Sequence, residues 1–177
     1  EDNDLYEITV NNETYTIDDV YDSEYGNFRM EGKVDHIEEK YTSNELFNYF
    51  NISKNSLIKK SVQLMGGHLI FQKNSHTKNF LQSFKDVLLE DINLLTDFYT
   101  SNQVEKFIEN RHDQSIMSLI SKTMGCESIA NETYFEEFSD KQYLYPFLSV
   151  RNYGHGLKDR TKYSLHIGDT YSKLKYF

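Results

Sequence analysis

The chain of 177 residues is 38% hydrophobic and 15% aromatic, which allows one domain with a sizeable core and excludes a largely disordered chain. Its formal net charge of -9 argues against sequence-independent binding of nucleic acid, which needs clustered Lys and Arg. No window approaches roughly 18 consecutive apolar residues and no signal-peptide pattern opens the chain, so we expect no membrane span and a cytoplasmic location. The single cysteine, Cys126, excludes an intramolecular disulfide.

Two short alternating segments come first, on either side of the pair Asn11-Asn12. Their apolar or aromatic members are Tyr6, Ile8, Val10, Tyr15 and Ile17. Because asparagine tolerates positive φ, this pattern predicts a β-hairpin with a two-residue turn. The acidic and aromatic stretch 18–31 has no clear period, and we expect a loop there with a short strand near residues 28–30.

A capping box, Thr42 with Glu45 three residues later, predicts a short helix over about residues 43–50. A polar connector follows, and then a strand-like stretch, residues 63–73, that carries the pair Gly66-Gly67. The apolar run at 69–71 favours a strand covered on both faces. The glycines indicate either close approach of a backbone or ligand, or a simple β-bulge.

Apolar spacing predicts an amphipathic helix over about residues 77–90, capped by Thr77 or Ser75, that packs on the sheet as a crossover. Residues 91–102 read as a loop with Asp97 as its candidate site residue. A second short helix is expected at about residues 104–108, directly before Arg111.

Four adjacent polar residues, Arg111 to Gln114, precede an apolar helical pattern that ends at Gly125. Asp113 lies where an N-cap belongs, so tying off the backbone is one interpretation. The other is a site, because Arg111 and His112 adjoin Asp113 at a helix N-terminus whose dipole suits an anionic ligand. Downstream, residues 126–130 read as a strand, and Glu132 behind it is either a second candidate acid or a salt-bridge partner of Arg111 or Arg151.

The string FIENRHDQSIMSLISKTMG, residues 107–125, resembles a segment of glycosyltransferase-like proteins of capsule-type polysaccharide biosynthesis, of the nucleotide-diphospho-sugar transferase type. The glycine strand 63–73, the stretch 94–97 and two short stretches at 131–134 and 145–147 are similar to further parts of that family. The resemblance covers about residues 41–151.

This resemblance implies an α/β fold, the C-terminal part of a glycosyltransferase A-type fold, with a mixed sheet, flanking helices and an N-terminal β-hairpin. We therefore expect a single α/β domain over residues 1–177, with a hairpin and acidic loop at 1–40, a transferase-like core at 41–151 and a tail at 152–177. No glycine-rich phosphate loop occurs. Since the first residue is Glu1, we expect the chain to be the acceptor-side half of a longer product.

The resemblance also implies an activity, transfer of a sugar from a nucleotide-sugar donor to a glycan acceptor. Asp113 and Glu132 are then the candidate catalytic carboxylates, since glycosyl transfer needs a carboxylate to deprotonate or orient the acceptor hydroxyl. The candidate substrate-binding residues are Arg111, His112, Gln114, Gly66, Gly67, Asp97 and Lys158. A divalent cation, Mn or Mg, would bind His155, in outline as in related enzymes.

Two other functions fit the sequence. A non-catalytic carbohydrate-binding or scaffold domain derived from a transferase would account for the missing nucleotide-binding half and for the 14 Tyr and 12 Phe residues. An acidic protein-interaction module is allowed by the net charge but not indicated by it.

Overall fold

The computed structural model describes residues 7–10, 13–16, 24–129, 133–134 and 147–148. By its internal contacts the chain divides into two compact units, Glu1–Glu132 and Thr133–Phe177. The second unit contributes one described feature, a parallel pair of short strands, β6 (Thr133–Tyr134) and β7 (Phe147–Leu148). All other described elements belong to the first unit.

The first unit contains five strands and six helical segments among the described residues. In chain order they are β1 (Glu7–Val10), β2 (Glu13–Thr16), β3 (Asn27–Glu31), α2 (Glu38–Tyr41), α3 (Asn44–Tyr49), α4 (Leu57–Lys60), β4 (Leu64–Phe71), α5 (Ser75–Glu90), the 3-10 helix η1 (Ile92–Leu95), α6 (His112–Met124) and β5 (Glu127–Ile129). The strands β1 and β2 form the predicted antiparallel hairpin, and the pairing of Val10 with Glu13 confirms its two-residue turn.

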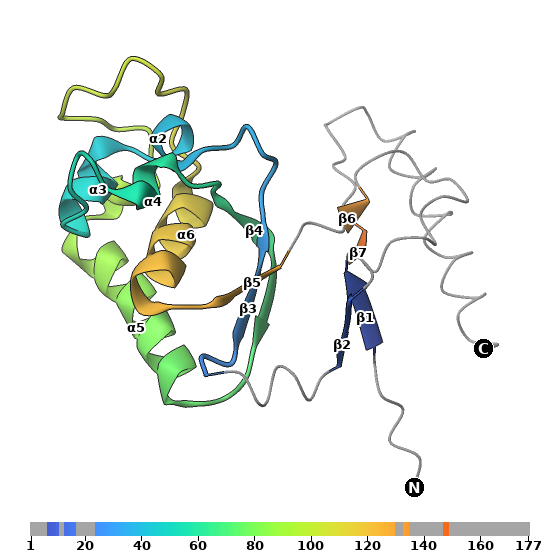
Figure 1. The fold of residues 1–177 in the computed structure, drawn as a ribbon. Coiled ribbons are helices and arrows are strands. Elements are labelled where there is room, and N and C mark those ends of the chain that lie inside the picture. Colours follow the sequence, from blue (N-terminus) through green and yellow to red (C-terminus); the bar gives the residue numbers. More distant parts are fainter. Residues whose placement is uncertain (1–6, 11–12, 17–23, 130–132, 135–146, 149–177) are drawn as a thin grey trace, which may run out of the picture. The chain divides into compact units, whose positions relative to one another are not determined.

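A three-stranded mixed sheet organises the rest of this unit, with α5 and α6 on one side of it (Figure 1). Its strand order is β4-β3-β5, in which β3 runs antiparallel to β4 and parallel to β5. The α/β class, the mixed sheet and the strand near residues 28–30 are therefore confirmed. Only the central strand is well covered, since four residues of β3 are buried, whereas most of β4 is half-buried. The prediction of a strand covered on both faces was wrong for β4, which pairs antiparallel with β3 in a sheet that has α5 and α6 on one side.

The glycine pair of β4 combines both predicted features. The register between β3 and β4 shifts opposite the glycines, between Arg29 and Glu31, which marks an irregularity in the ladder. A Cβ on Gly66 would lie 3.1 Å from Cβ of Gln114, so the glycine lets α6 approach the strand closely. Nothing lies within 4 Å of a Cβ built on Gly67. The neighbour that Gly66 accommodates is therefore a helix of the same chain.

The apolar core lies between α3, α5 and α6. Its buried members are Leu46, Phe47, Ile52, Phe80, Val87, Leu94, Ile116, Leu119 and Ile120. The ring of Phe80 also meets Phe71 of β4 at 5.2 Å between centroids, so α5 packs against the sheet as predicted. The helix α6 confirms the central helical pattern, and it ends at Gly125, whose φ of 100° favours glycine.

The helix ends differ from the predictions by one to three residues. Ser43, not Thr42, caps α3, and Glu45 instead accepts hydrogen bonds from the loop amides of Thr100 and Ser101 at 2.7 and 2.6 Å. Asn74 caps α5 by accepting from the amide of Thr77 at 2.8 Å, so neither Thr77 nor Ser75 is the cap. Asparagine and serine are equally good caps, so side-chain type alone does not place the boundary.

The predicted helix at 104–108 is absent from the described chain, where this segment forms a turn. The amide of Phe107 donates to the carbonyl of Val104, but the amides of Ile108 and Glu109 donate to the carbonyl of Lys40. Tertiary hydrogen bonds to α2 thus replace the local bonds that a helix would need.

Arg29 joins the central strand to its neighbours from a fully buried position. Its guanidinium donates to the carbonyl of Met65 at 2.8 Å, to Oγ of Ser121 at 2.8 Å and to the carbonyl of Met117 at 3.3 Å. Burial lowers the pKa of Arg29 to about 10, so the side chain stays charged at neutral pH. This cation holds α6 against the sheet.

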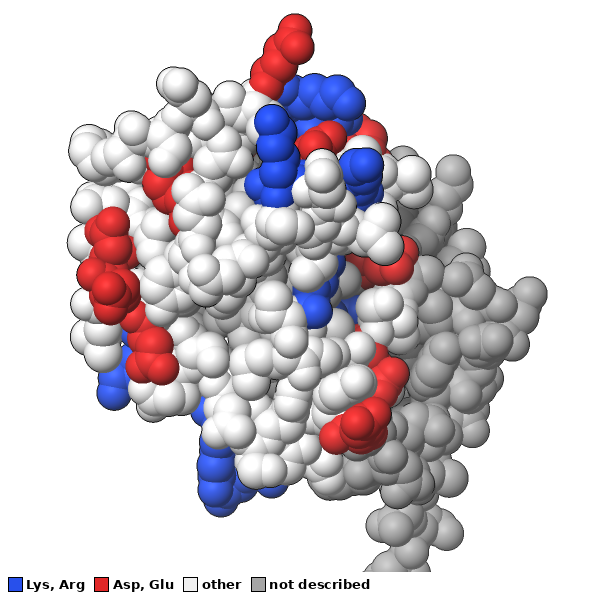
Figure 2. Space-filling view, turned by 60° about the vertical axis from the view of Figure 1, so that its left-hand side comes forward, with Lys and Arg blue, Asp and Glu red and all other residues white. Residues whose placement is uncertain are grey.

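The side of the molecule that carries α3 and α5 comes forward in Figure 2. On this face, small groups of charged side chains border a largely uncharged surface, and Lys and Arg lie next to Asp and Glu in the group at the top of Figure 2. Leu81 and Leu89 of α5 and Ile92 of η1 are exposed apolar residues of the described chain. No helix within the described ranges is both long and apolar enough to cross a lipid bilayer.

Candidate functional site

The start of α6 is fixed by backbone and serine contacts and not by Asp113. The amide of Arg111 donates to the carbonyl of Tyr41 at 3.1 Å and to Oγ of Ser115 at 3.0 Å, and Ser115 Oγ donates to the same carbonyl at 2.7 Å. Arg111 is thus the N-cap residue, and no side chain caps the helix. The prediction of Asp113 as N-cap was wrong, because these contacts start the helix at His112.

Asp113 lies instead in the first turn of α6, where it is exposed. No hydrogen bond or ion pair of the described residues engages its carboxylate. This carboxylate is therefore free to contact a ligand in solution, beside the positive end of the helix dipole.

His112 has a φ of 50°, which is uncommon for a residue with a side chain. Its Nε2 lies 3.3 Å from Oδ1 of Asp97, and the two side chains are 48% and 65% exposed. The structure therefore brings together His112 and Asp97, two candidate residues that are 15 positions apart in the sequence. Backbone strain of this kind persists where the surrounding structure enforces it.

Asp97 is held by Tyr99, which lies two residues later in the same loop. The Tyr99 hydroxyl donates to Oδ1 of Asp97 at 2.8 Å and accepts from the amide of Asn110 at 3.1 Å. Burial and the hydrogen bond to Asp97 raise the pKa of Tyr99 to about 12. The hydroxyl therefore remains a protonated donor at neutral pH.

Asn110 anchors this arrangement from the interior, with a relative exposure of 2%. Its side-chain amide donates to the carbonyls of Leu94 and Thr96 at 3.2 Å each. These bonds join Asn110, the residue that precedes Arg111, to the end of η1 and to Thr96, the residue that precedes Asp97. The two segments that carry the exposed site are thus joined by buried hydrogen bonds.

Arg111 is half-buried and partly engaged within the protein. Its guanidinium carbon lies 3.8 Å from the centre of the Tyr41 ring, and Nη1 lies 2.9 Å from Nδ1 of His36. Nε is 3.4 Å from a carboxylate oxygen of Glu109. Burial and the charge of Arg111 lower the pKa of His36, which keeps this imidazole neutral as a hydrogen-bond acceptor. Arg111 is therefore oriented, and its role with an external anion stays a prediction.

Gln114 is tied to the strand β4 region as well as to Gly66. Its amide nitrogen donates to Oε1 of Gln63 at 2.9 Å. Gln63 is fully buried, and its own amide nitrogen faces the carbonyl of Tyr41 and the carboxylate of Glu38, which accept only. This orientation leaves Oε1 of Gln63 as the group that meets Gln114.

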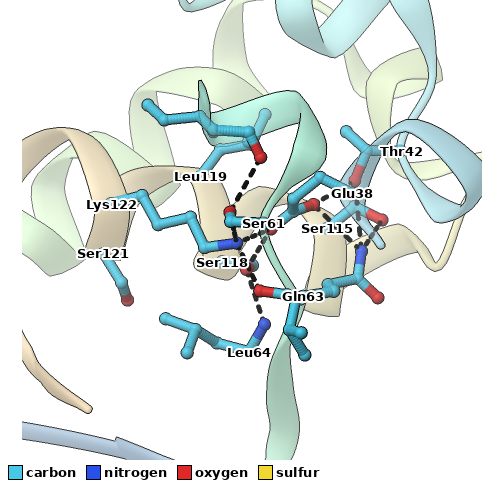
Figure 3. A network of polar contacts seen from close by, with 12 residues as sticks. Glu38, Thr42, Ser61, Gln63, Leu64, Ser115, Ser118, Leu119, Ser121 and Lys122 are labelled. Carbon is cyan, nitrogen blue, oxygen red and sulfur yellow. Dashed lines mark hydrogen bonds and ion pairs between the residues drawn. The ribbon is translucent and has the colours of Figure 1, made fainter. Parts of the chain in front are cut away.

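Glu38 is the centre of a buried polar network, drawn in Figure 3. Its carboxylate accepts from Thr42 Oγ1 at 2.6 Å, from Ser118 Oγ and from Lys122 Nζ at 2.7 Å. Lys122 Nζ also donates to Oγ of Ser61 at 2.8 Å and to the carbonyl of Val62 at 2.6 Å. The network therefore joins α2, the start of β4 and the polar face of α6.

The remaining predicted site residues either lie outside the described residues or have other surroundings. Glu132, Lys158 and His155 lie outside the described residues, so their predicted roles remain untested. Gly67 faces open space, and Gly66 is occupied by contact with Gln114. Within the described ranges, no group of three or more His, Cys, Asp or Glu side chains is arranged to hold a metal ion. The predicted divalent cation therefore has no described ligand set.

Comparisons with known proteins found no match, whether against family models, curated proteins or solved structures.

Sequence reasoning missed the residues that hold the site together. These are His36, Tyr41, Gln63, Asn110 and Glu38. His36, Glu38, Tyr41 and Gln63 are far from α6 in the sequence, and only the tertiary fold places them beside it, whereas Asn110 directly precedes Arg111. The spacing of Ser115, Ser118, Ser121 and Lys122 along one helix face was the available signal for a buried polar contact.

Proposed function

We propose that this chain is part of a glycosyltransferase that moves a sugar from a nucleotide-sugar donor to a glycan acceptor, and that it supplies the acceptor-side half. The resemblance of residues 41–151 to polysaccharide-biosynthesis transferases motivates the proposal. The geometry at the start of α6 supports it, because Asp97, His112 and Asp113 form an exposed polar group on a buried scaffold.

Glycosyl transfer needs a group that accepts the proton of the acceptor hydroxyl and a positive environment for the departing diphosphate. The exposed group offers two carboxylates and an imidazole for the first task. The N-terminal end of α6, a helix of 13 residues, and the guanidinium of Arg111 beside it offer positive charge for the second.

One observation carries the proposal: the carboxylate of Asp113 caps nothing and is exposed. An aspartate at a helix start is usually explained by capping, and this one is not. Asp113 therefore contributes little to the fold and is available to a sugar hydroxyl.

The test uses the full-length protein that contains this chain. It measures the release of nucleoside diphosphate and the formation of extended glycan. UDP-glucose, UDP-galactose, UDP-N-acetylglucosamine and GDP-mannose serve as donors, lactose and maltose as acceptors, each with Mn²⁺ and with EDTA. We expect transfer from one donor, and loss of at least about 100-fold of it in Asp113→Asn. Asp86→Asn, an exposed carboxylate on α5 hydrogen-bonded by Gln82, is the matched control and keeps full activity.

A second function is favoured by one observation, the 59% exposure of Phe98 next to Asp97. An exposed aromatic ring beside polar groups suits stacking on a sugar in a carbohydrate-binding domain. Binding of a glycan that weakens in Phe98→Ala, with no diphosphate released from any donor, would favour this function over transfer.

A further inference from the structure

The hydrogen bonds around Asp97 have a single possible direction. The backbone N–H of Asn110 can only donate, so it donates to a lone pair of the Tyr99 hydroxyl oxygen at 3.1 Å. The Tyr99 proton is then directed to Oδ1 of Asp97 at 2.8 Å. The Nε2 of His112 lies 3.3 Å from the same oxygen, at ion-pair distance, and a carboxylate oxygen favours a protonated nitrogen there over a lone pair.

The carboxylate of Asp97 favours one tautomer of a neutral His112. With the proton on Nε2, the lone pair lies on Nδ1, which is then the basic nitrogen of the ring. The carboxylate beside Nε2 also stabilises the positive ring that forms when Nδ1 takes a proton, as in other pairs of an imidazole and an acid. The side chain is 48% exposed, so a ligand in solution can reach the ring.

We propose that His112 is the general base of the transfer reaction, with Asp97 as the residue that positions and polarises its imidazole. This inference rests on the proposed function and gives His112 the proton transfer that the sequence assigned to Asp113. Asp113 then holds hydroxyls of the donor sugar, and the loss expected in Asp113→Asn reflects weaker binding of the transition state. The Tyr99 hydroxyl holds Asp97 by a hydrogen bond, and the backbone N–H of Asn110 holds Tyr99.

The acceptor hydroxyl oxygen forms a bond to the anomeric carbon of the nucleotide sugar while its proton passes to Nδ1 of His112. The bond between the anomeric carbon and the diphosphate oxygen breaks, and its electron pair leaves with the nucleoside diphosphate. His112 later returns the proton to water.

The first measurement uses His112→Asn in the full-length protein that contains this chain, with the same panel of donors. Asparagine tolerates the positive φ at this position and can still hydrogen-bond Asp97, but it cannot take a proton. We expect kcat to fall by at least about 100-fold with KM nearly unchanged. In His112→Gly, which also suits the positive φ, added imidazole should restore part of the lost rate.

The second measurement uses Asp97→Asn, which keeps an acceptor for the Tyr99 hydroxyl but removes the carboxylate charge beside the imidazole. We expect kcat to fall with KM nearly unchanged, and to fall less than in His112→Asn, because the base remains. The double variant with His112→Asn should lose no more kcat than His112→Asn alone, since Asp97 acts through the imidazole. The control Asp86→Asn keeps the wild-type kcat.

The outcomes separate this inference from the function beneath it. Transfer by the wild type with a full kcat in His112→Asn would overturn the inference and leave the transferase intact. A full kcat in Asp97→Asn, or a double variant that loses far more kcat than His112→Asn alone, would also overturn it. Absence of transfer from every donor in the wild type would overturn both. Loss of kcat in both single variants, with rescue of His112→Gly by imidazole, would establish His112 as the base.

Discussion

In the C-terminal half of α6, Ser118 and Lys122 face Glu38 inside the protein, and each polar atom that this pair of residues presents has a partner. At the N-terminal end of the same helix, His112 and Asp113 are exposed, and the carboxylate of Asp113 has no partner among the described residues. Both ends of the helix therefore carry polar side chains, which are buried and paired at one end and exposed at the other.

The difference separates residues that stabilise the fold from residues that the fold only positions. A buried polar group that loses its partner keeps the full cost of leaving water, so the inner network constrains stability. An exposed group exchanges its partner for water at little cost. Substitutions in the network should therefore change the free energy of unfolding, while substitutions at the exposed end should change binding or rate.

The largest expected effect comes from breaking the buried ion pair. Lys122 and Glu38 are 2.7 Å apart, and their side chains are 13% and 0% exposed. Lys122→Met leaves the carboxylate buried without its cation, and we expect a loss of about 3 kcal/mol in the free energy of unfolding. Urea unfolding followed by circular dichroism measures this loss.

The double variant Glu38→Leu with Lys122→Met is the control for that loss. Replacing both charges by apolar side chains removes the unpaired carboxylate, so the double variant should be more stable than Lys122→Met alone. A double variant less stable than the single one would show that Glu38 matters mainly through Thr42 and Ser118.

A smaller effect compares a true helix cap with the aspartate that resembles one. Ser43 Oγ accepts from the amide of Leu46 at the start of α3, so Ser43→Ala should cost about 1 kcal/mol. Asp113→Ala should cost no more than about 0.5 kcal/mol, since it loses only a favourable position near the helix dipole. Urea unfolding of the two variants measures both losses in the free energy of unfolding. Equal losses in the two variants would return Asp113 to a structural role.

The periodic parts of the fold were predictable because local pattern and tertiary packing agree there. The hairpin around residues 11–12, the apolar face of α6 and the terminating Gly125 all follow from spacing and φ preference. The edge position of β4 was not predictable from its apolar run at residues 69–71, because strand order depends on pairing with residues 27–31.

The candidate site was predictable in its members and not in its arrangement. Asp97 and His112 were chosen separately, and only the buried bonds of Asn110 to the carbonyls of Leu94 and Thr96 bring their segments together. Asp113 looked like a cap because an aspartate before an apolar run commonly is one. The helix begins at His112 because the carbonyl of Tyr41 accepts hydrogen bonds from Arg111 and Ser115. Such long-range contacts leave no local signal in the sequence.

The smallest expected effect concerns pH and lies at the exposed end, where His36 accepts a hydrogen bond from Arg111. Burial and then Arg111 lower the pKa of His36 from its ordinary value of 6.5, while Asp35 and Glu109 raise it and Lys33 lowers it. The unfolded chain then binds this proton more readily than the folded one. Stability from His36 is complete above about pH 6.5 and is lost as the pH falls toward the lowered pKa.

His36→Gln keeps an acceptor for Arg111 but cannot be protonated. The free energy of unfolding of the variant should therefore decline less than that of the wild type between about pH 7 and pH 5. The carboxylates that titrate at lower pH are the same in both proteins and cancel in the difference. An equal decline would mean that His36 binds its proton equally well in the folded and unfolded chains. A steeper decline in the variant would mean that His36 binds its proton more tightly when folded, so that Arg111 does not require it neutral.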